Sequence, residues 1–575
     1  MSMNAQSCAL PKDLEAKVQA RIESLQDQDV VRRIWAGDPF VWTGADEDQW
    51  LGWLNLPVHQ RTELARLFRL AGEVRREGVS HVLLLGMGGS SLAPEVLKMT
   101  FGRVHGYPEL HVLDSTDPSQ IRAVERAIDL PRTIFIVASK SGSTLEPNIL
   151  KQYFFDRVSQ KIGESEAGGR FMAITDPGSK LQQVAERDRF RHIFFGVPSV
   201  GGRYSALSNF GLVPSALMGV DVSKLLDRAE AMARRCAPDP DEGAGGNPAL
   251  VLGTVLGVLA AEGRDKPTFI LSPGIADFGA WLEQLLAEST GKLGKGLVPI
   301  NGEAPGPIEA YGDDRLFVYL RLDSAPDPAQ EAHVDALERA GQPVVRILVT
   351  DANGLGEEFY RWEMATAVAG AVLAVNPFDQ PDVEESKIAT RRLAAEYEKA
   401  GRFPEESPLI QERGLSLFAD EANREALVVA GRPSVAGYLK AHLGRLGAGD
   451  YFALLAYVEM NDAHTDALQA MRHLVRDRKH VATCVGFGPR FLHSTGQAYK
   501  GGPDSGVFLQ VTCDEADDLP VPGQKYTFGV VKAAQARGDL EVLAARRSRA
   551  LRVHIGSDVS RGLDALRGAV AQALA

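Results

Sequence analysis

Between residues 81 and 187 short apolar runs alternate with amphipathic segments, and this rhythm restricts the fold more than any other feature of the chain. Strands that alternate with helices are typical of a parallel sheet with helices on both faces. Ligands of such sheets bind at the carboxyl ends of the strands. The predicted elements, strand and helix in turn, are 81–85, 91–101, 110–113, 120–127, 133–138, 144–162, 171–174 and 180–186.

The rhythm returns after a segment rich in Pro, Gly and Asp at 235–247, which we interpret as a linker or domain boundary. We therefore expect an α/β fold with two doubly wound parallel-sheet domains. A helical N-terminal segment precedes them, and strands at 481–485 and 506–511 predict an additional α/β segment at the C-terminal end. The expected boundaries are 1–58, 59–234, 248–390 and 391–575.

Composition excludes several classes of function. The net charge of −12 argues against a nucleic-acid surface. The four cysteines are scattered without metal-ligand spacing, so neither structural zinc nor a disulfide framework is expected. The sequence shows no membrane-spanning apolar run and no signal peptide, which predicts a cytoplasmic protein without membrane contact.

The segment SKSGSTLE, residues 139–146, follows the third predicted strand and begins the next predicted helix. Short hydroxyl side chains, backbone N–H groups at a helix start and one lysine suit an anion such as phosphate. The alternative is a capping box between Ser143 and Glu146, which uses different donors and is compatible with an anion site. We predict a phosphate-binding loop.

The segment GMGGSS, residues 86–91, follows the first predicted strand and has two interpretations. Ser90 and Ser91 can donate to a phosphate, or the glycines form a tight turn and Ser90 caps the helix. A dinucleotide fingerprint with Asp114 as the ribose-binding acid fails at its third glycine, which is Ser91 here. Because loops after the first and third strands can face each other, the two serine-rich loops can converge on one anion.

Three further motifs could carry chemistry. Arg203 lies in VGGRYS, where glycines allow close approach and a guanidinium can stabilise oxyanion charge. Gln284 and Glu288 share a helix face, and the dipole at the helix end raises a carboxyl pKa and favours a general base. Lys387 begins a helix after the rigid turn at 376–381. Each charged residue alone would equally suit an ordinary solvated position.

These motifs stand in the same order as in phosphoglucose isomerases, which the sequence resembles over roughly residues 60–390. The matching strings are GMGGSS, SKSGSTLE, VGGRYS, QLLAESTGK and NPFDQPDVEESK. The resemblance is closest to the isomerase half of bifunctional transaldolase–phosphoglucose isomerase proteins. It implies two sugar-isomerase (SIS) domains that interconvert glucose 6-phosphate and fructose 6-phosphate through a cis-enediolate, in glycolysis and gluconeogenesis. It implies a small sugar phosphate as the binding partner and no metal or redox cofactor.

The resemblance assigns a role to each matching residue. Glu288 corresponds to the base that moves a proton between C1 and C2, and Arg203 corresponds to the residue that stabilises the enediolate. Lys387 corresponds to the lysine that assists ring opening. The remaining matches bind the substrate: Ser90, Ser139, Lys140, Ser141 and Thr144 at the phosphate, and Glu146, Gln284 and Gln380 around the sugar.

One departure concerns a histidine that opens the sugar ring in the family and follows the base closely. The corresponding stretch, 299–315, contains no histidine, whereas FLHSTGQ at 491–497 resembles the context of the catalytic histidine in some bacterial members. We therefore expect His493 to supply this function; the alternative is an ordinary core or surface histidine. Family dimers lend this histidine across the interface, so a His493 from the same chain would relax that need. The sequence leaves open whether the chain forms a homodimer.

Three other functions fit parts of the sequence. A bifunctional phosphoglucose/phosphomannose isomerase would differ near Thr290, which bears on stereochemistry at C2. A non-catalytic sugar-phosphate-sensing SIS protein needs the serine loops but not Glu288, Arg203 and Lys387 together. An NAD-dependent dehydrogenase rests only on the glycine-rich loop and Asp114.

Overall fold

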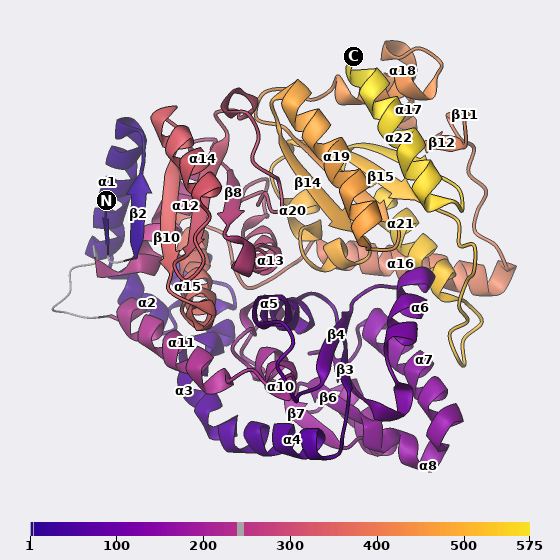
Figure 1. Ribbon diagram of the computed structural model, residues 1–575. Coiled ribbons are helices and arrows are strands. Elements are labelled where there is room, and N and C mark those ends of the chain that lie inside the picture. Colours follow the sequence, from indigo (N-terminus) through magenta and orange to yellow (C-terminus); the bar gives the residue numbers. More distant parts are fainter. Residues whose placement is uncertain (1, 4, 239–245) are drawn as a thin grey trace.

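The structure is a computed structural model that describes all residues except 1, 4 and 239–245 (Figure 1). Its first sheet has five parallel strands in the order β4-β3-β5-β6-β7. The predicted alternation is confirmed here to within a few residues, and β7 was not predicted. The strands are β3 (His81–Leu85), β4 (Glu109–Leu113), β5 (Thr133–Ala138), β6 (Phe171–Thr175) and β7 (His192–Phe195); the helices between them include α5 (Leu92–Phe101), α6 (Pro118–Ala127), α7 (Leu145–Ile162) and α9 (Lys180–Arg187).

The second sheet has the order β1-β2-β10-β9-β8. The strands β8 (Lys266–Leu271), β9 (Arg315–Leu322) and β10 (Val344–Val349) are parallel, as expected. However, β2 (Gln6–Ala9) pairs antiparallel with β10, and β1 (Ser2–Met3) continues that edge. The expected helical N-terminal segment thus also contributes two strands, which were not predicted and which add an antiparallel edge to the second sheet. Four residues are too short for a periodic signal, and their partner strand lies far along the chain.

Long buried helices cover the second sheet. Helix α12 (Pro248–Ala261) is buried along most of its length and packs on α15 (Leu355–Leu373). Helices α13 (Phe278–Thr290) and α11 (Val222–Cys236) lie nearby, and α1 (Lys12–Asp27) packs on α12. The contact of α12 with α15 is close because Gly253 has no side chain: a Cβ there would lie 2.3 Å from the carbonyl oxygen of Ala365. The predicted linker at 235–247 lies largely in the part of the chain outside the described residues.

The third sheet, from the C-terminal segment, repeats the topology of the first. Its parallel strands have the order β14-β13-β15-β16, which matches β4-β3-β5-β6, and two antiparallel strands extend the edge beyond β16. The sequence predicted only two of its six strands, β14 and β15. The strands are β11 (Ile410–Glu412), β12 (Leu415–Phe418), β13 (Tyr451–Tyr457), β14 (Ala482–Phe487), β15 (Gly506–Thr512) and β16 (Arg549–His554).

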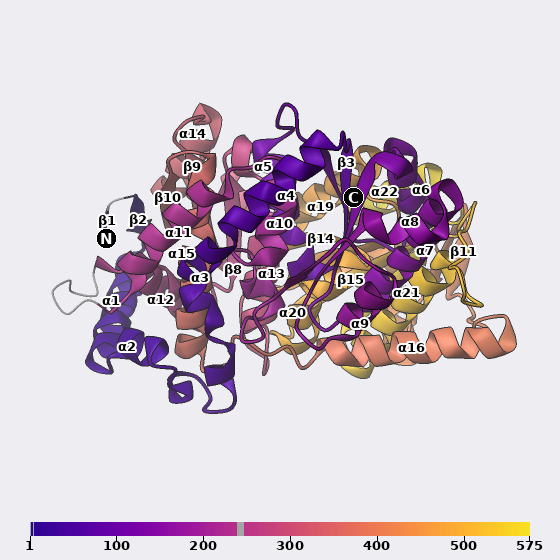
Figure 2. The ribbon, with the colours of Figure 1, turned by 90° about the horizontal axis from the view of Figure 1, so that it is seen from below.

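The helices of the third unit include α19 (Asp462–Lys479), α20 (Gly496–Gly501), α21 (Phe528–Ala545) and α22 (Val559–Leu574). Figure 2 shows α16 (Val383–Ala400) along one side of the molecule, where it packs on α21. Apolar residues of α21 and of the segment before it join the core on one face of the first sheet, and Val298 and Ile300 join a core of the third. The third unit is thus packed against both other sheets. The domain boundaries given above stay a prediction.

No helix within the described ranges is both long and apolar enough to cross a bilayer.

Candidate active site

The predicted phosphate loop lies between β5 and α7, at the carboxyl edge of the first sheet. Gly142 makes the turn with φ of 67°, and a Cβ there would lie 2.4 Å from the backbone nitrogen of Leu181. The amide of Asn148 donates to the carbonyl oxygens of Gly142 (3.1 Å) and Thr144 (2.7 Å), which fixes the loop on the first turn of α7. The alternative, a capping box between Ser143 and Glu146, is absent among the described contacts, because Thr144 is the N-cap residue and Glu146 contacts His493 and Gln535.

Arg203 is buried and holds the parts of the site from the second sheet together. Its guanidinium donates to Ser289 Oγ (2.6 Å), Gln380 Oε1 (2.8 Å) and two backbone carbonyl oxygens of the 377–379 turn. The same group lies 3.5 Å from Glu288 Oε1. The structure therefore brings Arg203, Glu288 and Gln380 together, as the resemblance predicts. A fixed cation beside a carboxylate can stabilise an enediolate as it forms.

Glu288 lies in the last turn of α13, where the sequence placed it. Gln284, one turn earlier, donates to Glu288 Oε2 (3.0 Å) and to the carbonyl oxygen of His493 (2.8 Å). This amide joins the base on α13 to the loop that carries His493. The base and the histidine, far apart in the sequence, are thus neighbours in the folded chain.

His493 lies in a turn after β14 and pairs with a buried carboxylate, since its Nε2 is 3.0 Å from Glu146 Oε1. Burial would raise the pKa of Glu146, but the charge and hydrogen bond of His493 outweigh it, so that the pKa is lowered. Glu146 is therefore a carboxylate at neutral pH. Its contact with Nε2 fixes the orientation of the imidazole. The alternative of an isolated surface histidine does not fit this position.

The phosphate loop and His493 face a common cavity of about 390 Å³. Lys387 lies at its wall near the start of α16, 3.5 Å from Glu384, and its charge also lowers the pKa of Glu146. The cavity is large enough for a hexose phosphate. The predicted residues that line it are Ser141, Thr144, Glu146, Lys387 and His493.

Three predicted phosphate binders do not line this cavity. Ser139 is buried and its hydroxyl donates to Thr144 Oγ1 (3.2 Å). Lys140 pairs with Asp176 and donates to the carbonyl oxygen of Pro198 (3.1 Å), so it supports the loop from behind. Ser90 lies in the neighbouring turn that packs on the Arg203 loop. As the structure stands, direct phosphate contact is expected from Ser141 and Thr144, and it stays a prediction for Ser90, Ser139 and Lys140.

The glycine-rich turn after β3 serves close packing. A Cβ at Gly89 would lie 2.1 Å from the carbonyl oxygen of Gly202, and one at Gly88 would lie 2.7 Å from that of His493. Asp114, the candidate ribose binder, instead accepts from Ser91 and pairs with Arg490 (3.3 Å). A nicotinamide dinucleotide would have to displace this ion pair, which argues against the dehydrogenase reading.

Gln535 is a site residue that sequence reasoning missed. Its amide donates to Glu146 Oε1 (2.6 Å), and its own oxygen accepts from Thr116 Oγ1 (2.7 Å). The residue is buried on α21, and it lines the cavity beside His493. A lone glutamine in an amphipathic helix carries no motif, so only the folded arrangement reveals it.

One group of possible metal ligands occurs among the described residues: His81, Glu109 and His111. They lie at the amino ends of β3 and β4, the edge opposite to the phosphate loop. Burial lowers the pKa of His111 to about 4, and its Nε2 lies 3.1 Å from His81 Nδ1. This pair therefore has no place in the candidate site.

Comparison with known proteins agrees with this geometry. The family model of phosphoglucose isomerase matches residues 69–304. The glucose-6-phosphate isomerase of Rubrobacter xylanophilus is 30% identical over 61% of this chain and 89% of the relative. That of Acholeplasma laidlawii is 30% identical over 66% and 98%.

Two solved structures share the fold of this chain. A hypothetical protein of Thermus thermophilus superposes with a TM-score of 0.59 at 25% identity, over 67% of this chain and 99% of that one. A glucose-6-phosphate isomerase of Chlamydia trachomatis, 20% identical, shares the fold with a TM-score of 0.58 over 70% and 90%. On its sequence relatives and on the residues gathered around Arg203, the chain belongs to the phosphoglucose isomerase family.

Proposed function

We propose that the protein interconverts glucose 6-phosphate and fructose 6-phosphate through an enediolate intermediate. The observation that carries this proposal is the chain of contacts from Arg203 to Glu288, through Gln284 to His493, and from His493 to Glu146 beside the phosphate loop. It provides a base, a cation for the intermediate, a proton donor and an anion site within one region. The family and its substrate support a cytoplasmic enzyme of glycolysis and gluconeogenesis.

The phosphate fixes the sugar without taking part in the bond changes. Ser141 and Thr144 at the start of α7 would hold it, because hydroxyl groups and a helix N-terminus both favour a dianion. Binding energy from this remote group holds C1 and C2 in register with the base.

Ring opening needs a proton delivered to the ring oxygen and a proton removed from the C1 hydroxyl. We assign the first transfer to His493, whose ring Glu146 orients. The proton of the C1 hydroxyl passes through solvent water back to the imidazole, so the step is balanced. Lys387, across the cavity, would stabilise negative charge on the oxygen as the C1–O5 bond breaks. The product is an open-chain aldehyde whose C2 hydrogen is acidic.

Isomerisation moves one proton from C2 to C1 and another from the C2 hydroxyl to O1, and it leaves the substrate redox-neutral as a whole. Glu288 removes the C2 proton, the electron pair forms the enediolate, and the same carboxyl group returns the proton to C1. Arg203, 3.5 Å from Glu288, stabilises the negative oxygen charge meanwhile. Oxidation at C2 balances reduction at C1, so the chemistry requires no external electron acceptor.

The test is a coupled assay with fructose 6-phosphate as substrate, applied to Glu288→Gln. General base catalysis is worth on the order of 10²–10⁴-fold, so we expect kcat to fall by about 10²-fold or more. Glu425→Gln, an exposed glutamate on α17 (Glu421–Ala430), is the matched control and should keep full activity. Substantial kcat in Glu288→Gln would refute the assignment.

His493→Ala separates ring opening from proton transfer. It should lower turnover of cyclic glucose 6-phosphate strongly, because the proton donor for the ring oxygen is lost. Exchange of the C2 hydrogen with solvent deuterium in substrate that has opened spontaneously should persist, since Glu288 remains. An unchanged rate on the cyclic substrate would exclude His493 as the ring-opening residue.

A further inference from the structure

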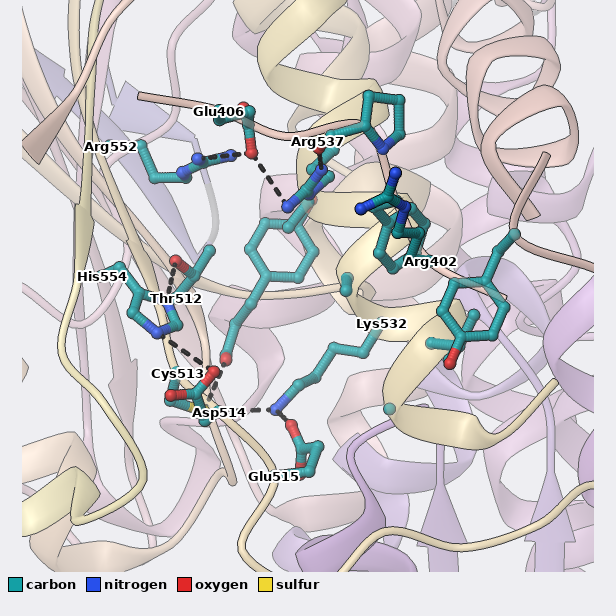
Figure 3. Close-up of a pocket in the computed structure, with 18 of the residues that line it drawn as sticks. Arg402, Glu406, Thr512, Cys513, Asp514, Glu515, Lys532, Arg537, Arg552 and His554 are labelled. Carbon is teal, nitrogen blue, oxygen red and sulfur yellow. Dashed lines mark hydrogen bonds and ion pairs between the residues drawn. The ribbon is translucent and has the colours of Figure 1, made fainter. Parts of the chain in front are cut away.

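The third sheet has a cavity of its own, of about 750 Å³, at the carboxyl ends of its parallel strands (Figure 3). Tyr457 ends β13, Thr512 ends β15 and His554 ends β16, and all three residues line the cavity. Ligands of parallel sheets bind at this edge. The cavity is distinct from the candidate active site, with which it shares no lining residue.

This cavity lies at the same edge of the third sheet as the phosphate loop does in the first sheet. The strands β14-β13-β15-β16 have the order of β4-β3-β5-β6, and in the first sheet the loop after β5 lines the active-site cavity. In the third sheet the loop after β15 reads CDEADD instead of SKSGST. It offers carboxylates where the first sheet offers hydroxyl groups, so any anionic group of a ligand must be held elsewhere in this cavity.

Two arginines of the cavity can bind such an anionic group. Arg537 on α21 and Arg552 on β16 both bind the same carboxylate, with distances from Glu406 Oε2 to their Nη2 atoms of 3.0 Å and 2.9 Å. The Arg552 side chain is only 6% exposed, and its Nε has no hydrogen-bond partner among the described residues. Two guanidinium groups thus share one negative charge, which leaves a surplus of positive charge on this side of the cavity.

The arginines are held in fixed planes. The guanidinium of Arg537 lies 4.7 Å from the ring centroid of Phe403, and that of Arg552 lies 4.3 Å from that of Phe418. Stacking of this kind keeps the edges of the guanidinium free for bidentate anion binding. Figure 3 shows Arg402 on the same side of the cavity.

Glu406, which bridges the arginines, is the element that can move. It lies in the irregular segment between α16 and β11, and its side chain is 35% exposed. A carboxylate on such a segment can leave without disturbing the sheet. It occupies the place that a carboxylate or phosphate of a ligand would take.

The opposite side of the cavity is acidic. Asp514 lies 3.2 Å from His554 Nε2 and is largely exposed, and Glu515 pairs with the buried Lys532. Carboxylates at this side accept hydrogen bonds from hydroxyl groups. The two sides together suit a ligand with an anionic group at one end and hydroxyl groups along its length.

We propose that this cavity binds a small polyol that carries one phosphate or carboxylate group, which replaces Glu406 between Arg537 and Arg552 while its hydroxyl groups donate to Asp514 and Glu515. This second site lies beside the third sheet and does not depend on the reaction proposed above. Helix α21 connects the two regions, because Arg537 and Lys532 line this cavity whereas Gln535 binds Glu146 of the active site.

Calorimetric titration of the full-length Glu288→Gln chain tests the proposal, because that variant binds sugar phosphate without turning it over. Glucose 6-phosphate probes a phosphate ligand, and gluconate probes a carboxylate ligand. We expect at least one of the two compounds to bind in this cavity, and we expect the double variant Arg537→Gln/Arg552→Gln to lose that binding. For glucose 6-phosphate, this cavity would be a second binding site per chain. Arg567→Gln, an exposed arginine on α22, is the control and should change nothing.

Glu406→Gln guards against a loss caused by misfolding. Removal of the internal competitor should tighten binding at this site about tenfold, equivalent to about 1.4 kcal/mol, which an unfolded variant cannot do. The proposal is overturned if glucose 6-phosphate binds at one site per chain, gluconate binds nowhere, and neither titration responds to Glu406→Gln.

Discussion

At the scale of single residues, the position of the Glu146 carboxylate is fixed by two side chains from distant parts of the sequence. It is buried and accepts hydrogen bonds from His493 and Gln535 at the same oxygen, Oε1. Hydrogen bonds to a carboxylate are worth about 1.5–3 kcal/mol, more than those between neutral groups. The geometry makes Gln535 a positioning residue that acts through Glu146 on His493.

Gln535→Leu should therefore lower kcat for cyclic glucose 6-phosphate by about 10- to 100-fold, the equivalent of one such hydrogen bond. Loss of the donor also raises the pKa of Glu146, so the acid limb of the kcat–pH profile should move to higher pH. Gln524→Leu, which lines the same cavity without contact to Glu146, is the control. A fall in kcat with an unmoved pH profile would indicate a merely structural role.

Glu283, next to Gln284 on α13, gives a prediction about stability. Burial raises the pKa of Glu283 from 4.5 to about 7, although Arg472 and Arg490 oppose the shift. The folded state holds the proton more tightly, so stability falls as pH rises from 4.5 to 7, by up to about 3 kcal/mol. Glu283→Gln should match the parent near pH 4.5 and exceed it in urea denaturation at pH 8. A stability difference that is constant with pH would contradict this cause.

The residues that the sequence revealed are those that lie in local motifs. Arg203, Glu288 and Lys387 could be singled out because each stands in a short string of glycines, hydroxyl residues or prolines. Gln535 could not, because its role arises from contacts with Thr116 and Glu146 more than 380 residues away. His493 was found through its neighbours in sequence, but only the fold shows its carboxylate partner.

At the scale of elements, periodicity predicted most parallel strands of the first two sheets because each is a continuous apolar run flanked by turn residues. It missed the parallel strands β7, β13 and β16, although β13 is itself a buried apolar run. It also failed for β2, whose four residues carry too little pattern, so that tertiary pairing rather than local preference determines this strand.

The contact between α12 and α15 offers a test at this scale. A Cβ at Gly253 would lie 2.3 Å from the carbonyl oxygen of Ala365 and 2.6 Å from Val368 Cβ. Gly253→Ala should therefore destabilise the protein by about 1–3 kcal/mol through overpacking, measured by urea denaturation. Gly568→Ala on α22, where a Cβ meets nothing within 4 Å, should instead stabilise by up to about 1 kcal/mol. Equal effects at the two positions would refute the packing argument.

At the scale of the whole molecule, the described residues of one chain contribute every side chain in the network around Glu288, His493 and Glu146. The C-terminal unit provides His493 and Gln535, and the rest of the chain provides the base and the phosphate loop. A second copy is not needed to complete this arrangement.

Complementation between inactive variants tests this. Glu288→Gln and His493→Ala chains, refolded together, should show no more activity than either alone, because no chain then holds both groups. If a partner lent the histidine in a dimer, about half of the dimers would be mixed and each would have one complete site, so the mixture would recover about a quarter of parental activity. Recovery of that size would contradict a site built within one chain, and parental chains refolded in the same way are the control.

The place of β16 in the third sheet has a consequence for synthesis. The last strand of the chain lies between β15 and β12, not at an edge. While a nascent chain is still on the ribosome, β12 and β15 therefore each present an unpaired edge, which is where non-native strand pairing and aggregation begin. Residues 549–554 close this gap only after they have themselves been synthesised. A product that stops before residue 549 would keep both edges open, so it should be a target for chaperones and proteases rather than a partly active enzyme.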